Sequence, residues 1–158
     1  MKQHTWKRCA LWVLFTEAVG GLSGFLTRRG MEVYKAEVLK PPLSPPNIVF
    51  PIVWTILFAL MGIGAARVAQ APASGERSRS LTLFFVQLAF NFLWTILFFN
   101  LQSFGFAFLW LAALWGFILW MIRAFCRVDR TAALMQVPYL LWTAFAGYLN
   151  LGVWWLDR

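Results

Sequence analysis

Five apolar runs, each about twenty residues long, occupy most of this 158-residue chain. A helix of that length spans the hydrocarbon core of a bilayer. With 61% hydrophobic and 13% charged residues, a domain of this size could not hide its apolar surface from water. The sequence therefore predicts a single all-α membrane domain, a bundle of five transmembrane helices, with spans at about residues 9–27, 48–69, 81–101, 104–125 and 131–155.

The connections between the runs are short except for the first, which extends from Arg28 to Asn47. It holds the polar stretch TRRGMEVYKAEVLK and then PPLSPPN, with four prolines between Pro41 and Pro46. Proline has a fixed φ and no backbone N–H, so this second part is predicted to be extended rather than helical. In the fifth run, Pro138 predicts a bend.

The net charge of +8 is not gathered into a basic stripe. Lys and Arg stand at the ends of the apolar runs, where they anchor spans and meet lipid headgroups. We therefore expect membrane lipids as partners, and no nucleic acid. Five spans place nine positive residues on the side of the N-terminus and five on the other side, which predicts a cytoplasmic N-terminus and an outside C-terminus in the cell membrane. The nine are Lys2, Lys7, Arg8, Arg67, Arg77, Arg79, Arg123, Arg127 and Arg130; the five are Arg28, Arg29, Lys35, Lys40 and Arg158.

Small and polar residues recur at helical spacing inside the runs. In the first run, Glu17, Gly20, Gly21 and Gly24 share one face, which favours close helix packing through Gly20 and Gly24. Three other runs carry aromatic rings on one face, and two of these faces also carry amides. Each of these faces alone is typical of a packed core, but the three together favour an internal cavity, because buried amides need partners. Their members are Trp54, Phe58, Met61, Gly62 and Ala65; Gln87, Asn91, Trp94, Thr95 and Phe98; and Pro138, Trp142, Ala146, Asn150 and Val153.

Conventional catalytic and metal-binding motifs are absent from the sequence. It contains no glycine-rich phosphate loop, no HExxH motif and no paired carboxylates, and its one histidine, His4, lies in the N-terminal tail. Cys9 and Cys126 fit neither a metal nor a disulfide pattern. We expect no metal site, no required cofactor and no conventional catalytic residue.

Three segments are similar to those of one known family: KPPLSPPNIVFPIVWTILFALMGIGAARV (Lys40–Val68), QLAFNFLWTILFF (Gln87–Phe99) and VPYLLWTAFAGYLN (Val137–Asn150). In this order and spacing they resemble the translocator proteins, also called tryptophan-rich sensory proteins or TspO/MBR. The resemblance covers the whole chain. It implies a five-helix bundle, usually a homodimer, with a pocket between the helices that opens toward the first loop.

The resemblance also implies a ligand, a porphyrin such as protoporphyrin IX. By motif, Trp54 and Trp142 match the two tryptophans that the family associates with porphyrin. Leu43 departs from the family, because a tryptophan often stands at this loop position, and the cholesterol motif of the animal proteins is not matched at Leu151. The expected ligand-binding residues are Trp54, Phe58, Asn91, Trp94, Pro138, Trp142, Ala146 and Asn150, with Lys40, Leu43, Pro45 and Pro46 in the loop.

Four functions stay open on the sequence. The first is a tetrapyrrole receptor or carrier, with a regulatory or stress-sensing role, in which Arg28, Arg29 or Lys40 would meet the porphyrin propionates. The second is light- or oxygen-dependent degradation of porphyrin, with Trp54 and Trp142 as electron donors. The third is an interaction protein with a filled interior. The fourth is a proton-coupled transporter, indicated only by Glu17 and without the internal repeat of many transporters.

Overall fold

The computed structural model describes residues 2–157, with side chains from Thr5 to Asp157, so the side chain of His4 lies outside the described residues. Within this range all regular elements are helices. In chain order they are α1 (Lys2–Leu26), α2 (Arg28–Glu37), α3 (Val49–Ala69), α4 (Gly75–Thr95), the π-helical turn η1 (Ile96–Asn100), α5 (Phe104–Cys126), α6 (Arg130–Met135) and α7 (Val137–Leu156).

Among the described residues, five helical segments are long and apolar enough to cross a membrane. They confirm the predicted five-span bundle. The third segment begins before its apolar run because the side chain of Ser74 caps α4, accepting a hydrogen bond from the backbone N of Arg77 at 3.0 Å. The segments are Thr5–Leu26, Val49–Ala69, Gly75–Asn100, Phe104–Cys126 and Arg130–Leu156.

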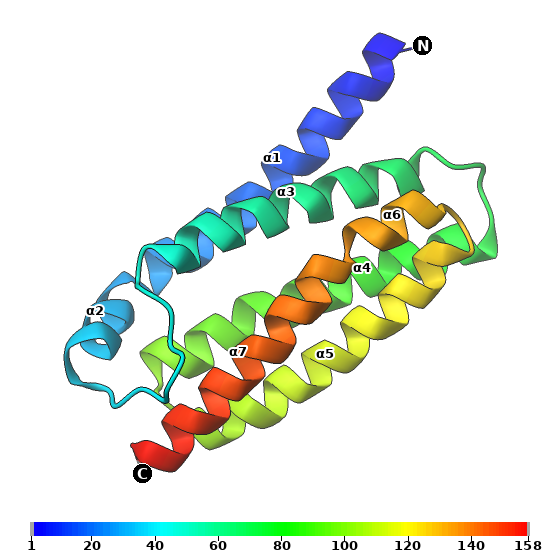
Figure 1. Cartoon of the computed structure of the whole chain (residues 1–158). Helices are drawn as coiled ribbons and strands as arrows, with labels where there is room; N and C mark the ends of the chain where they lie inside the picture. Colours follow the sequence, from blue (N-terminus) through cyan, green and yellow to red (C-terminus); the bar gives the residue numbers. More distant parts are fainter. Residues whose placement is uncertain (1, 158) are drawn as a thin grey trace.

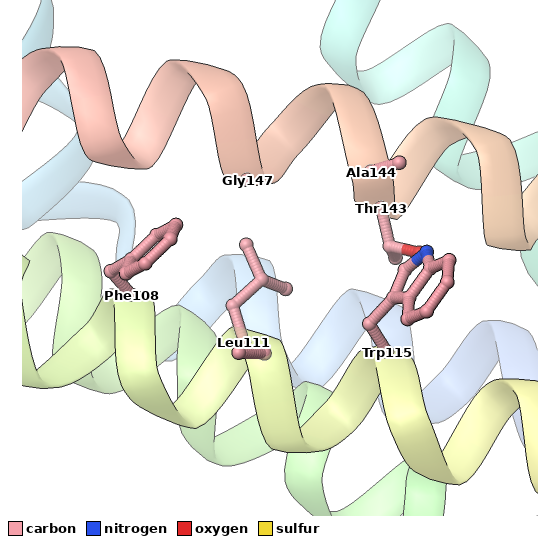
Figure 2. Close-up of a pocket in the computed structure, with 7 residues that line it drawn as sticks. Phe108, Leu111, Trp115, Thr143, Ala144 and Gly147 are labelled. Atoms are coloured by element: carbon pink, nitrogen blue, oxygen red, sulfur yellow. The ribbon is translucent and has the colours of Figure 1, made fainter.

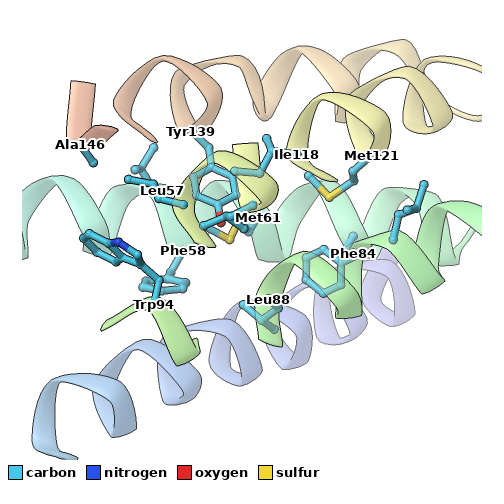
Figure 3. Close-up of a cluster of buried hydrophobic side chains, with 14 of the residues drawn as sticks. Leu57, Phe58, Met61, Phe84, Leu88, Trp94, Ile118, Met121, Tyr139 and Ala146 are labelled. Carbon is cyan, nitrogen blue, oxygen red and sulfur yellow. The ribbon is translucent and has the colours of Figure 1, made fainter. Parts of the chain in front are cut away.

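The helices pack in pairs that share a common core. α1 packs along α3, α4 along α5, and α5 along α7, while α6 joins the C-terminal half of α3 to α5 (Figure 1). Side chains from four helices meet in the middle, where Met61, Phe84, Ile118 and Tyr139 are fully buried (Figure 3). This core fixes the relative positions of α4, α5 and α7, on which the candidate site depends.

Glycines bring α1 and α3 together. A Cβ added to Gly20 would lie 2.5 Å from the ring of Phe58, and one added to Gly62 would lie 2.6 Å from the Cα of Val13. The hydroxyl of Thr16 donates to the carbonyl of Phe58 at 2.7 Å. The predicted packing is therefore confirmed for Gly20 and wrong for Gly24, where an added Cβ would meet no atom within 4 Å.

The first connection contains a helix that the sequence analysis did not predict, α2. Its buried side is formed by Tyr34 and by Val38 just beyond its end. The ring of Tyr34 lies 5.4 Å from that of Phe98 and 5.3 Å from that of Phe99, so α2 packs on the end of the third span. The proline segment that follows is non-helical, as predicted.

The fifth span is broken rather than bent. α6 ends at Met135, Gln136 forms a turn, and Pro138 occupies the first turn of α7. The missing N–H of a proline costs little at that position, because the first amides of a helix have no intrahelical acceptor.

The α1–α3 contact gives the first prediction. Gly62→Ala places a methyl group against the backbone of α1, so we expect a loss of about 1–3 kcal/mol in stability. Gly21→Ala is the matched control, because an added Cβ there meets no atom within 4 Å. Thermal unfolding of both variants in detergent measures the difference. Equal stability of the two would contradict the close contact at Gly62.

Candidate functional site

Aromatic rings of α3 and α7 meet near the first loop. The rings of Trp54 and Tyr139 lie 6.2 Å apart, and those of Phe50 and Trp142 lie 5.9 Å apart, so each predicted tryptophan contacts a ring of the opposite helix. Both indoles are half-buried. We call this cluster the aromatic seam; it consists of Phe50, Trp54, Phe58, Tyr139, Trp142 and Phe145.

One polar atom in the aromatic seam lacks a partner. The Nε1 of Trp142 is buried and has no hydrogen-bond acceptor among the described residues. A buried donor without an acceptor costs about 1–3 kcal/mol, and native structures leave few such atoms unpaired. This N–H is therefore a donor available to an oxygen atom of a ligand in the seam.

The interior amides, by contrast, bond from helix to helix. The hydroxyl of Tyr139 donates to Oε1 of Gln87 at 2.7 Å and accepts from Nδ2 of Asn91 at 2.7 Å. These two bonds connect α7 to α4 in the buried core, so the amide of Asn91 already has a protein partner.

A second set of hydrogen bonds joins α4 and α7 closer to the loop end of the bundle. The Nε1 of Trp94 donates to Oδ1 of Asn150 at 3.0 Å, and Nδ2 of Asn150 donates to the carbonyl of Phe104 at 2.8 Å. Trp94 and Asn150 thus connect α4, α7 and the start of α5. Both were predicted to bind ligand, and in the structure their polar atoms stabilise the bundle.

The remaining predicted helix residues separate into two groups. Phe58 is buried against Gly20 and Trp54 within the seam, and Ala146 is buried in the core beside it (Figure 3). Pro138 is exposed at the start of α7. The structure thus brings Trp54, Phe58 and Trp142 into one cluster and leaves Pro138 outside it.

The proline loop is attached to the C-terminal half of α7. Pro41 packs on Gly152, where an added Cβ would lie 2.5 Å from the proline ring. The hydroxyl of Tyr148 donates to the carbonyl of Pro42 at 2.6 Å, and the backbone N of Leu39 donates to Oδ1 of Asp157 at 3.3 Å. The loop then returns to the start of α3 (Figure 1). It therefore connects the two helices that form the aromatic seam.

The predicted loop residues differ in their environments. The ammonium of Lys40 donates to the carbonyls of Tyr34 at 2.8 Å and Val38 at 3.0 Å, so it closes the end of α2. Leu43 is 82% exposed and has a φ of 69°, in the left-handed region. Pro45 is half-buried and Pro46 is exposed. At the position where the family often has tryptophan, the Leu43 side chain therefore lies on the surface rather than in the core.

The sequence analysis missed an apolar groove of about 250 Å³ between α5 and α7. Figure 2 shows Phe108, Leu111 and Trp115 of α5 pointing toward Thr143, Ala144 and Gly147 of α7. The polar atoms at the groove are used within the protein, because Trp115 Nε1 donates to the carbonyl of Leu140 at 3.2 Å and the Thr143 hydroxyl to that of Tyr139 at 2.9 Å. The sequence signal that could have indicated this groove is the presence of small residues on the facing sides of the two helices, Ala112 in α5 and Ala144 and Gly147 in α7.

Comparison with known proteins matches residues 12–156 to the TspO/MBR family. The tryptophan-rich protein TspO of Chlorobaculum tepidum is 39% identical over 134 residues, which are 84% of this chain and 85% of that protein. The tryptophan-rich sensory protein of Cereibacter sphaeroides is 40% identical over 111 residues, covering 70% and 68% of the two chains. The translocator protein of Bos taurus is 34% identical over 140 residues, covering 87% and 83%.

The buried hydroxyl of Tyr139 gives the second prediction. Tyr139→Phe removes a group that bonds both Gln87 and Asn91 and leaves two buried amides without these partners. We expect a loss of about 2 kcal/mol in stability. Tyr148→Phe is the control, because it removes an exposed hydroxyl from the loop contact. Unfolding in detergent measures both variants, and an equal, small effect would show that the amide bonds do not stabilise the bundle.

The third prediction concerns alkaline pH. Burial raises the pKa of Tyr34 to about 12 from its ordinary value of 10. The unfolded chain therefore loses this proton first, and the contribution of Tyr34 to stability, complete below pH 10, is lost as the pH rises toward 12. We expect Tyr34→Phe to show a shallower fall in melting temperature over this range than the unchanged protein. Identical slopes would contradict burial of the neutral phenol.

Proposed function

Since the chain belongs to the TspO/MBR family, we propose that this membrane protein binds a porphyrin, such as protoporphyrin IX, in the aromatic seam between α3 and α7. The observation that carries the proposal is the buried Nε1 of Trp142, which has no acceptor among the described residues and lies beside rings of both helices. The proposed role is that of a receptor or carrier.

A porphyrin has the chemistry that the seam lacks. Its flat apolar faces stack on indole and phenyl rings, and its propionate oxygens accept hydrogen bonds. Trp54 and Trp142 supply the rings, and the Trp142 N–H supplies a donor. Arg28 and Arg29 are exposed at the start of α2, at the loop end of the bundle, where a second propionate would find a cation.

Binding requires the seam to open. Phe50 and Tyr139 contact the two indoles across the seam. The two sides of the seam belong to different helix pairs, because α3 packs along α1 and α7 packs along α5. The aromatic contacts at the loop end are therefore those that a macrocycle replaces when it inserts.

The closed seam also favours a second candidate function. A protein that docks a partner through its outer surface needs no internal ligand, and its interior is filled by its own rings. Protoporphyrin titration separates the two functions, because only the first gives saturable binding. A homodimer, the cell membrane and a cytoplasmic N-terminus stay predictions from the resemblance and from the charge distribution.

The fourth prediction tests the seam. Trp142→Phe keeps an aromatic ring but removes the N–H, so we expect the Kd for protoporphyrin IX to rise about tenfold. Trp54→Phe reduces the stacking surface, and we expect a rise of about threefold. Trp6→Phe is the matched control, because Trp6 is 72% exposed near the N-terminus. The porphyrin absorbance band follows binding without using the indoles as reporters.

Two outcomes would reject this site. Equal affinity of Trp142→Phe and Trp6→Phe would place the porphyrin elsewhere on the protein. An unchanged protein that shows no saturable binding in detergent or in bilayer discs would favour the interaction protein.

A further inference from the structure

A second groove, of about 230 Å³, opens at the opposite end of the bundle from the proline loop. It lies between the first turns of α4 and the last turns of α5. Its lining contains three arginines, one carboxylate and one indole, in contrast to the apolar groove between α5 and α7. The lining residues are Glu76, Arg79, Trp120, Arg123, Ala124 and Arg127.

The three arginine side chains of this groove are free. The side chains of Arg79, Arg123 and Arg127 are exposed and make no hydrogen bond or ion pair with the part of the chain that the structure describes. Two other arginines at this end are engaged: Arg67 pairs with Asp129 at 3.0 Å, and Arg77 donates to the carbonyl of Ala71 at 2.9 Å. Among the described residues, Arg8 and Arg130 at this end are also exposed without such a contact, but they do not line the groove. Three of the five free guanidinium groups of this end therefore gather at it.

The groove has an excess of positive charge. Three guanidinium groups line it together with the single carboxylate of Glu76. The positive dipole end of α4 and the negative dipole end of α5 both lie at the groove, so the excess positive charge comes from the guanidinium groups. An anion is the ligand that this charge distribution favours, and planar guanidinium groups match the oxygen atoms of a phosphate.

The position of the groove indicates the source of that phosphate. It lies where the third and fourth membrane segments, Gly75–Asn100 and Phe104–Cys126, end on the same side. Trp120 is 53% exposed and stacks on Phe117 at 6.4 Å, and exposed tryptophans at the ends of spans lie at the level of the lipid headgroups. At this level the phosphate of a phospholipid is at hand, and its hydrocarbon chains can lie along α4 and α5.

We infer that this groove binds the phosphate of an anionic phospholipid through Arg79, Arg123 and Arg127, with Trp120 packing against the glycerol and upper acyl region. The site is separate from the aromatic seam, which lies near the other end of the bundle. Porphyrin binding and lipid binding therefore fail or succeed independently.

Native mass spectrometry of the purified protein with equal amounts of phosphatidylglycerol and phosphatidylcholine tests the site. A charge-assisted hydrogen bond from a guanidinium to a bound phosphate strengthens binding about tenfold or more, so Arg79→Gln with Arg123→Gln should lower phosphatidylglycerol retention by at least about tenfold. Arg8→Gln with Arg130→Gln is the matched control. It removes the same charge from exposed positions at the same end, outside the groove, and should stay within about twofold of the unchanged protein.

A third variant has an effect of the opposite sign. Glu76→Gln removes the carboxylate from the groove, so we expect phosphatidylglycerol retention to rise about threefold. The melting temperature of each variant without added lipid confirms that the bundle is intact. A gain in phosphatidylglycerol over phosphatidylcholine with an unchanged melting temperature does not come from loss of the fold, so this variant complements the arginine variants.

Three results would overturn the inference. Equal losses in the two arginine pairs would mean diffuse attraction to surface charge. Equal retention of phosphatidylcholine would mean that the groove does not recognise an anion. Retention of inorganic phosphate at millimolar concentration, without retention of phosphatidylglycerol, would assign the groove to a soluble anion.

Discussion

Hydrogen bonds inside an apolar bundle hold this protein in one arrangement. In lipid a polar side chain has no water to bond, so its partner must come from the protein or from a ligand. The Tyr139 hydroxyl joins Gln87 and Asn91, and Asn150 joins Trp94 to the start of α5. These bonds fix both the rotation of α7 about its axis and its position along α4. They thereby set the direction in which Trp142 presents its ring.

The other side of the aromatic seam rests on a different kind of contact. α1 and α3 approach closely because Gly20 and Gly62 have no side chains, and Thr16 adds one hydrogen bond between them. Farther from the loop, Gln136 at the start of α7 donates to the carbonyl of Leu60 in α3 at 3.0 Å, and Arg67 of α3 pairs with Asp129 at 3.0 Å. Near the loop, aromatic rings form the contacts between α3 and α7.

The sequence predicts the spans because long apolar runs have few alternatives in a chain of this composition, and Trp54 and Trp142 were found from their motifs. It cannot decide the partners of the amides, because Asn91 and Asn150 carry the same helical spacing whether they bond a ligand or another helix. The role of Lys40 could not be predicted either, because its ammonium bonds the carbonyls at the end of α2. The only sequence signal for that helix is the apolar pair Tyr34 and Val38. Arg79 and Arg123 are far apart in the sequence, and only the antiparallel packing of α4 and α5 brings them to one groove.

The attachment of the proline loop to α7 has a consequence for the route of entry. This stiff segment contacts Gly152, Tyr148 and Asp157 and then continues directly into α3. It therefore ties the C-terminal half of α7 to the start of α3 through a segment whose length the prolines keep nearly constant. If a porphyrin binds in the aromatic seam as proposed, a route from water past the loop would have to displace this segment, whereas a route from the bilayer between α3 and α7 would leave it in place.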